Sequence, residues 1–260
     1  MSDYRPEPYW SRVAEQIANR GENYVAGDDD PYYRYKRRRF LNNFLDTIPV
    51  DGKCVLEVGF GPGGNLKHIA KHHSPRKLLG ADISQNMVNI AERNLRGIDI
   101  VELTKIDGTQ LPYPDASVDI SFTATVLQHN TDEKMFASLV HELCRVTEGT
   151  IFVMEDIGRA RHPGGDGDWI GRQVDVYRDA FKEEGFELAS VKFLNTKVSR
   201  NWRRRVHGYY NRFVVRSHQE GDPINPVFRF LIASPMPLTR ILDQIFVDEV
   251  DLAKMEFRRS

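Results

Sequence analysis

The feature that most constrains the fold of this chain is the segment from Val55 to Gly64, which reads Val-Leu-Glu-Val-Gly-Phe-Gly-Pro-Gly-Gly. Its short apolar run predicts a buried strand, and the glycines that follow predict a sharp turn into a helix. Glycine adopts positive φ angles at little cost and lets the backbone approach a ligand closely. The segment therefore predicts a strand-loop-helix unit that holds a nucleotide mainly through backbone groups.

Three predicted strands each end at a carboxylate. Glu57 lies at the end of the first, and the runs 77–82 and 100–107 end at Asp82 and Asp107. An acid at the end of the second strand can accept hydrogen bonds from both ribose hydroxyls. Glu57 would face a cation more favourably than the pyrophosphate of a dinucleotide. The pattern favours a positively charged nucleoside cofactor.

The glycine pattern alone leaves a second interpretation open. Gly59, Gly61 and Gly64 also satisfy the dinucleotide pattern GxGxxG, which is typical of nicotinamide oxidoreductases. A third interpretation is a binding module that holds an adenosine cofactor without catalysis.

Four sequence features occur in the order seen in one enzyme family. Glu57-x-Gly59-x-Gly61-x-Gly63, Asp82, Asp107 and the run Leu-Pro-Tyr-Pro-Asp-Ala-Ser-Val-Asp over 111–119 resemble the motifs of class I S-adenosylmethionine-dependent methyltransferases. Within that family they are most similar to the small-molecule branch described as type 11 or UbiE-like. The resemblance covers about residues 50–160 and implies methyl transfer from S-adenosylmethionine to a nitrogen, oxygen or carbon of a small-molecule acceptor.

The resemblance also implies roles for individual residues. Glu57 would meet the methionine amino group, Asp82 the ribose and Asp107 the adenine amine. Apart from the resemblance, Arg37 falls on the apolar stripe of its helix, where it would reach the cofactor's carboxylate, and Tyr33 would cover the cofactor or simply pack. The expected cofactor-binding residues are Glu57, Gly59, Gly61, Gly63, Asp82, Ile83, Asp107, Gly108, Thr123, Tyr33 and Arg37.

Two residues are candidates for a catalytic role. His129 follows the predicted fourth strand, in a loop that resembles the segment beside the reactive end of the cofactor, and Asp156 ends the fifth strand. A general base is needed only if the acceptor must lose a proton. The alternatives are a packing or hydrogen-bonding role for His129, and helix capping or solvation for Asp156.

The order of predicted elements indicates an α/β fold. We expect a Rossmann-like, seven-stranded, mostly parallel sheet with helices on both faces, plus an N-terminal helical cap and a C-terminal insertion that forms a lid. The expected divisions are a cap over 1–50, a cofactor-binding core over 51–195, a lid over 196–250 and a final core strand over 251–260. Residues 212–216 compete with 254–258 for the last strand, and we favour the later run.

The second helix of the cap has a clear start. Asp30 can cap it, Pro31 suits its first turn, and Asp28 and Asp29 suit its dipole. Its expected apolar stripe is Tyr33, Phe40, Leu41, Phe44 and Ile48.

Composition excludes some classes of function. The formal net charge is -1, so no overall field favours nucleic acid or a membrane surface. The N-terminus lacks the apolar core of a signal peptide, and no run of about 20 apolar residues occurs, so we expect a cytoplasmic protein without membrane association. Oligomeric state is not predicted.

Local clusters leave one further alternative and argue against a metal. The basic runs 36–39 and 203–205 lie among aromatics, as on an RNA-binding surface, so an RNA or protein methyltransferase stays open. His68, His72 and His73 have helical metal-ligand spacing, but a solvated helix end is expected there and no metal site is predicted.

Overall fold

The computed structural model describes residues 5–18, 30–164, 167–213, 226–247 and 251–260. The chain divides into two compact units. Unit 1 comprises residues 1–26, 48–192 and 252–260, and unit 2 comprises residues 27–47 and 193–251. Of the two helices expected over 1–50, the first packs against a helix of unit 1 and the second packs with the helices of unit 2.

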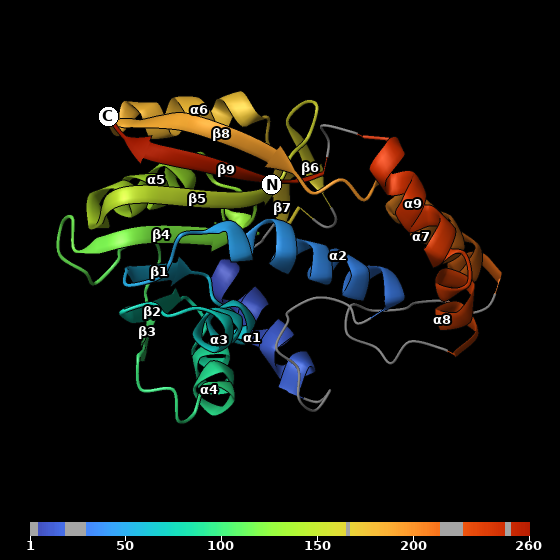
Figure 1. The fold of residues 1–260 in the computed structure, drawn as a ribbon, viewed down its shortest axis with the longest axis horizontal. Coiled ribbons are helices and arrows are strands. Elements are labelled where there is room, and N and C mark those ends of the chain that lie inside the picture. Colours follow the sequence, from blue (N-terminus) through green and yellow to red (C-terminus); the bar gives the residue numbers. More distant parts are fainter. Residues whose placement is uncertain (1–4, 19–29, 165–166, 214–225, 248–250) are drawn as a thin grey trace. The chain divides into compact units, whose positions relative to one another are not determined.

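Unit 1 is built on a seven-stranded sheet with the order β3-β2-β1-β4-β5-β9-β8 (Figure 1). The pairs β1–β2, β2–β3, β1–β4 and β4–β5 are parallel, whereas β9 is antiparallel to β5. The predicted Rossmann-like, mostly parallel sheet is confirmed. The strands are β1 (Cys54–Val58), β2 (Lys77–Asp82), β3 (Val101–Lys105), β4 (Val118–Ala124), β5 (Thr147–Asp156), β8 (Phe186–Phe193) and β9 (Leu252–Arg259).

Helices cover both faces of this sheet. The helix pair α3 (Gly64–His72) and α4 (Gln85–Asn94) packs on one face, and the pair α5 (Glu133–Val146) and α6 (Val174–Glu183) packs on the other (Figure 1). Strands that are covered on both faces must be apolar throughout, and β1 is buried at every position. This explains why the first strand reads as a continuous apolar run interrupted only by Glu57.

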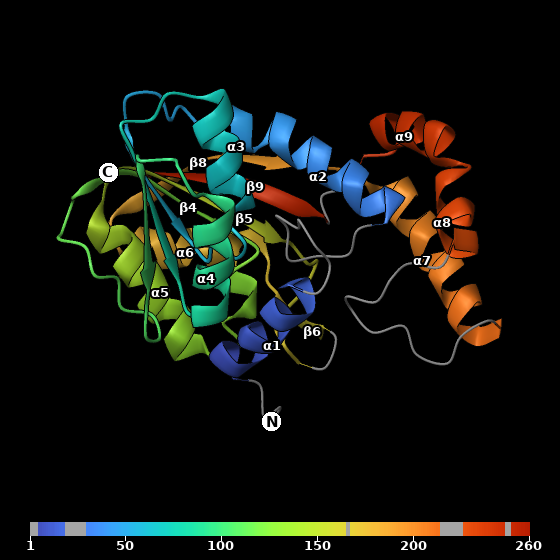
Figure 2. The ribbon, with the colours of Figure 1, turned by 90° about the horizontal axis from the view of Figure 1, so that it is seen from below.

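The N-terminal helix α1 (Pro6–Ala18) packs against α4 (Figure 2). Val13, Ala14 and Ile17 of α1 form a buried cluster with Met87 and Ile90 of α4. The apolar positions of α1 recur at helical spacing, so one face is buried. A short helical turn η2 (Leu127–His129) and a two-stranded ribbon of β6 (His162–Gly164) and β7 (Trp169–Gly171) complete unit 1.

Unit 2 is helical. Its elements are α2 (Pro31–Asn43), η1 (Leu45–Thr47), α7 (Lys197–Phe213), α8 (Pro226–Ala233) and α9 (Met236–Ile245). An apolar cluster joins α2, α7, α8 and α9 and consists of Tyr32, Tyr35, Val206, Phe228, Ile232 and Met236. A buried carboxylate supports it: Asp243 accepts hydrogen bonds from the backbone N–H groups of Val198 and Ser199 at 2.7 and 3.1 Å.

The predicted start of α2 is confirmed. Asp30 is the N-cap, and its Oδ1 accepts hydrogen bonds from the N–H groups of Tyr32 and Tyr33 at 2.8 and 2.9 Å. Pro31 occupies the first turn, where its missing N–H costs nothing. Asp28 and Asp29, which were expected to favour the helix dipole, lie outside the described residues.

The last strand in the chain is β9, which contains the later of the two predicted runs, 254–258. Arg212 and Phe213 of the competing run lie in α7, and residues 214–216 are outside the described part of the chain. Alternate residues of β9 enter the core, and Phe257 stacks on Phe181 of α6 with ring centroids 4.2 Å apart. Among the described residues, no helix is long and apolar enough to cross a membrane.

The burial of Phe257 allows a direct test of β9 as a core strand. Phe257→Ala should lower the free energy of unfolding by about 3 to 5 kcal/mol, because it removes a fully buried ring and leaves a cavity. Arg258→Ala, at the exposed neighbouring position, should change it by less than about 0.5 kcal/mol. Urea titration of both variants measures the difference. Equal effects would show that β9 does not contribute to the core.

Candidate functional site

The loop between β1 and α3 requires glycine at three positions. Gly59, Gly61 and Gly63 have φ angles of +74°, +53° and +83°, which side chains with a Cβ rarely adopt. A Cβ on Gly59 would lie 2.3 Å from Cγ2 of Val126, and one on Gly63 would lie 2.9 Å from Cδ1 of Leu95. At Gly61 the space that a Cβ would occupy is open. The loop thus packs tightly at its ends and leaves room at its centre.

Asp82, at the end of β2, is bonded to this loop. Its Oδ2 accepts a hydrogen bond from the N–H of Gly61 at 2.8 Å, and its Oδ1 accepts one from the N–H of Ser84 at 2.9 Å. Burial raises the pKa of Asp82 to about 6, although the N–H groups of Ser84, Gly61 and Ile83 oppose that shift. The expected ribose acceptor therefore holds the end of β2 against the glycine loop.

Glu57, at the end of β1, is almost completely buried. Its Oε1 accepts a hydrogen bond from Nδ2 of Asn65, on the first turn of α3, at 2.6 Å. Asn65 was not singled out from the sequence, because nothing in its local pattern shows that the helix turns it back toward β1. The structure places the two carboxylates of Glu57 and Asp82 at the ends of adjacent parallel strands, beside the glycine loop.

Asp107 is much less confined than these two acids. It follows β3, its side chain is 90% exposed, and it pairs with Lys105. Gly108, the next residue, has a φ of +75°. The structure therefore leaves the expected adenine-side acid at a turn on the surface.

Thr123 lies in β4 and is fully buried. Its hydroxyl donates a hydrogen bond to Oε1 of Glu155, in β5, at 3.2 Å. The role of Thr123 at the cofactor stays a prediction, and its observed contact is with an acid that sequence reasoning missed.

Glu155 is that missed acid. It is fully buried, and it accepts hydrogen bonds from the N–H groups of the segment 126–128 at 3.0 to 3.1 Å. Burial raises the pKa of Glu155 to about 7. Glu155 and Asp156 stand together at the end of one apolar run, and the sequence pattern does not show which of them points inward.

Asp156, the acid selected from the sequence, is partly buried. Its backbone N–H donates a hydrogen bond to Oε1 of Gln128 at 2.9 Å. Asp156 therefore lies beside η2, the turn that carries His129.

His129 has a defined protonation pattern. Its Nδ1 lies 2.8 Å from the carbonyl oxygen of Asp168, and because a carbonyl only accepts, Nδ1 carries the proton. The lone pair is then on Nε2, which lies 3.5 Å from the side-chain nitrogen of Gln128. Burial lowers the pKa of His129, so the ring is neutral at neutral pH. A neutral imidazole with a lone pair on Nε2 is chemically able to accept a proton.

Helix α1 contributes two aromatic residues near His129. The Tyr9 hydroxyl donates a hydrogen bond to Oδ2 of Asp168 at 2.9 Å. Trp10 meets the His129 ring edge to face, with centroids 4.9 Å apart. Ser11 on the same helix lies 3.0 Å from the hydroxyl of Ser84, beyond β2. No sequence signal linked α1 to these loops, because the contacts join residues far apart in the chain.

Tyr33 and Arg37, the expected cofactor contacts from the N-terminal segment, lie on α2 in unit 2. The Arg203 guanidinium lies over the ring of Tyr33 at 4.6 Å, and that of Arg37 lies over Phe40 at 5.3 Å. Both contacts are within unit 2, and the cofactor roles of Tyr33 and Arg37 stay predictions.

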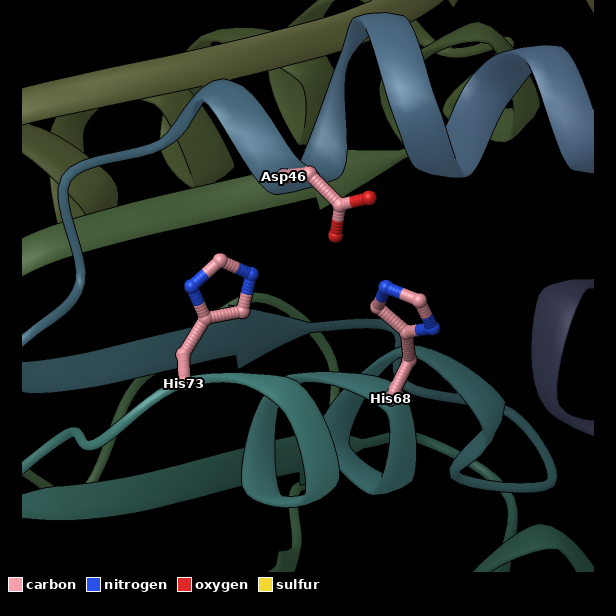
Figure 3. Close-up of side chains that lie close together, drawn as sticks. All are labelled: Asp46, His68 and His73. Atoms are coloured by element: carbon pink, nitrogen blue, oxygen red, sulfur yellow. The ribbon is translucent and has the colours of Figure 1, made fainter.

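Two histidines of unit 1 lie near each other at the C-terminal end of α3 (Figure 3). Nitrogen atoms of His68 and His73 approach within 4.8 Å, and both side chains are partly buried. Asp46, also labelled there, belongs to unit 2. Two imidazoles supply half of the ligands that zinc takes in a structural site, so we infer no metal centre from this pair.

The residues around the glycine loop fit the cofactor that the sequence resemblance implies. Carboxylates such as Glu57 and Asp82 accept hydrogen bonds from an ammonium group and from ribose hydroxyls. The open space at Gly61 allows the backbone to come close to a ligand. Acceptors with negative charge also suit a sulfonium cation better than a pyrophosphate.

Comparison with known proteins agrees with this assignment. Residues 55–149 match the family model described as a methyltransferase domain. Over 72 residues the chain is 36% identical to a fatty-acid O-methyltransferase of Mycolicibacterium smegmatis, which covers 27% of this chain and 25% of that enzyme. Over 125 residues it is 29% identical to an ajmaline N-methyltransferase of Rauvolfia serpentina, which covers 46% and 42%. The chain thus spans between a quarter and a half of the length of these curated relatives.

Solved structures share the fold over nearly the whole chain. The magnesium protoporphyrin IX methyltransferase of Synechocystis, with bound S-adenosylmethionine, has a TM-score of 0.62 at 12% identity and covers 98% of this chain and 95% of its own. The cyclase SpnF has a TM-score of 0.64 at 17% identity and covers 99% and 98%. The sheet order, the glycine loop with its two strand-end carboxylates and the matched segment lead to one conclusion: residues 55–149 form a methyltransferase domain of the class I S-adenosylmethionine-dependent kind.

Proposed function

We propose that this chain binds S-adenosylmethionine and transfers its methyl group to a nitrogen, oxygen or carbon atom of a small-molecule acceptor. The observation that carries the proposal is the pair of buried carboxylates, Glu57 and Asp82, at adjacent strand ends beside the glycine loop. In this position Glu57 binds the amino group of the cofactor and Asp82 binds the ribose hydroxyls. Asp107 is the acceptor for the adenine amine.

The chemistry requires alignment more than proton transfer. The bound cofactor supplies a methyl group on a positively charged sulfur, whose bond breaks as the acceptor's lone pair forms the new bond. The protein's task is to hold the acceptor in line and to exclude water. Positioning of this kind supplies roughly 7 to 11 kcal/mol of a barrier.

His129 is the general base for acceptors that must lose a proton. When an amine or hydroxyl is methylated, its proton leaves for the lone pair on Nε2 of His129. The bond from Nδ1 to the carbonyl oxygen of Asp168 keeps the lone pair on Nε2, where an acceptor's proton would replace the 3.5 Å contact with Gln128. We infer that Asp156, whose backbone N–H donates to the side chain of Gln128 in the same turn, orients the acceptor.

Two kinds of observation support a small-molecule acceptor. The matched relatives include a fatty-acid O-methyltransferase and an ajmaline N-methyltransferase. The basic side chains that suggested RNA bond within unit 2: Arg203 pairs with Asp30 at 2.5 Å, Lys36 with Asp251 at 3.8 Å, and Arg39 donates to the hydroxyl of Tyr35 at 3.0 Å. These bonds reduce the positive charge available to a phosphate backbone.

Asp82 should control cofactor affinity and its pH dependence. Asp82→Ala should weaken S-adenosylmethionine binding by about 2 kcal/mol, or roughly 30-fold, because charge-assisted hydrogen bonds are lost. In the native chain the affinity should fall as pH drops through about 6, where Asp82 becomes protonated and no longer accepts from both hydroxyls. Calorimetric titration between about pH 8 and pH 5 measures both effects.

The free protein should respond to pH in the opposite sense. The folded state holds the Asp82 proton more tightly than the unfolded chain, so this group's contribution to stability is complete below pH 3.8 and is lost as pH rises through about 6. Asp82→Asn should remove both dependences, and Asp99→Ala, at an exposed acid, should change neither. Unchanged affinity in Asp82→Ala would contradict the assigned ribose contact.

His129 should affect turnover and not cofactor binding. With an amine or hydroxyl acceptor found by screening, His129→Asn should lower kcat by roughly 100- to 10,000-fold, because the proton has no acceptor. The affinity for S-adenosylhomocysteine should stay within about twofold. His141→Asn is the matched control, since His141 is exposed and pairs with Glu184 at the C-terminal end of α6. A variant at His129 with native kcat would show that no base acts there.

A further inference from the structure

Buried charges hold the turn that carries His129 from both of its ends. At the first end, Oε1 of Glu155 accepts hydrogen bonds from the N–H groups of Val126 and Leu127, each at 3.0 Å, and Oε2 accepts one from Gln128 at 3.1 Å. Three consecutive N–H groups thus meet one carboxylate. Such groups have no partner within a helical turn, and a negative charge satisfies them most strongly.

Arg172 binds the other end of the same turn. Its Nη1 donates to the carbonyl oxygen of Leu127 at 3.1 Å, and its Nη2 donates to that of Asn130 at 2.7 Å. The guanidinium is 1% exposed, lies over the ring of Phe136 at 4.3 Å, and makes an ion pair with Glu133 at 3.3 Å. The planar fork of arginine suits two carbonyls at once.

The two charges match the polarity of the turn. The carboxylate faces the N–H end and the guanidinium faces the carbonyl end, as the dipole of a helical turn favours. Burying each charge costs free energy, and a buried charge is weak evidence for stability alone. What the arrangement provides is a turn whose backbone has one position.

Arg172 also controls the partner of the His129 ring. Asp168, whose carbonyl oxygen accepts from Nδ1 of His129, lies on the segment that enters β7, and Arg172 directly follows that strand. The backbone of Arg172 pairs with Ile157 at the end of β5. The guanidinium therefore sets the spacing between the turn with the imidazole and the strand with its acceptor.

A strained residue precedes the turn. Thr125 has a φ of +57°, which is rare for a β-branched side chain. Its N–H donates to the carbonyl oxygen of Met154 at 2.8 Å, next to Glu155. Backbone strain of this kind persists only where the surrounding contacts determine the conformation, and it gathers at functional sites.

We propose that Glu155 and Arg172 are positioning residues that act through the backbone of η2 to hold His129 as its Nδ1–H tautomer, with the lone pair left on Nε2. This inference rests on the proposed function, because a fixed tautomer matters for catalysis only where His129 takes the acceptor's proton. It adds two residues that touch neither cofactor nor acceptor.

The test reads the tautomer itself and needs no acceptor. Long-range proton–nitrogen correlation of the full chain labelled with nitrogen-15, with His129→Asn for assignment, should place the proton on Nδ1 in the native protein. In Glu155→Gln at least one N–H loses its acceptor, and in Arg172→Lys the two carbonyls lose their common donor. Both variants should show averaged signals of exchanging tautomers, with the titration midpoint of the ring raised toward 6.5.

Glu142→Gln is the matched control. Glu142 is also buried and accepts a backbone hydrogen bond, from Leu111 at 2.8 Å, but it lies on α5 away from η2. In the Glu142→Gln variant, the His129 ring should keep its native tautomer and its native titration midpoint. Far-ultraviolet circular dichroism shows whether each variant is folded. If Glu155→Gln and Arg172→Lys do not fold, Thr123→Val, which removes only the hydroxyl bond to Glu155, provides the test.

The outcomes separate this inference from the proposed function. A native tautomer and midpoint in Glu155→Gln, Arg172→Lys and Thr123→Val would overturn the positioning role. Failure of the native chain to bind S-adenosylmethionine would overturn the proposed function and leave the tautomer result readable. For an identified acceptor, Glu155→Gln should lower kcat by roughly 100-fold with little change in KM, as expected when a reacting group is displaced.

Discussion

Buried carboxylates at the ends of parallel strands must find hydrogen-bond donors, and the loops at that edge of the sheet supply them. Asp82 accepts from the glycine loop, and Glu155 accepts from the turn that carries His129. Glu57 accepts from the first turn of α3. Each of these hydrogen bonds holds its loop in place before a ligand binds. Buried carboxylates, the kind of group that would bind the proposed cofactor, therefore also preorganise these loops. Preorganised loops lose less conformational entropy when a ligand binds.

The parts that the sequence predicted depend on local physics. Gly59 and Gly63 need positive φ angles, so the turn after β1 could be read from residue type. Asp30 followed by Pro31 marked the start of α2, because capping involves neighbouring residues. The later of the two runs predicted for the last strand forms β9, whereas Arg212 and Phe213 of the competing run continue α7. In each case the deciding contact lies within a few residues along the chain or within one strand.

The parts that the sequence missed depend on contacts between distant segments. Glu155 and Asp156 are adjacent acids, and only the packing of β4 and η2 against β5 shows that Glu155 points inward. Tyr9 and Trp10 reach Asp168 and His129 across more than a hundred residues, which no local pattern encodes. The division of the first fifty residues between the two units follows from packing partners, since α1 finds its apolar partner in α4.

In the proposed function, the glycine loop and its two strand-end carboxylates hold a cationic adenosine cofactor. Calorimetric titration of the native chain with S-adenosylmethionine, S-adenosylhomocysteine and NAD measures this binding. We expect roughly micromolar binding of the first two, one molecule per chain, and no binding of NAD. Binding of NAD without S-adenosylmethionine would contradict it and would mean that the loop holds a pyrophosphate instead.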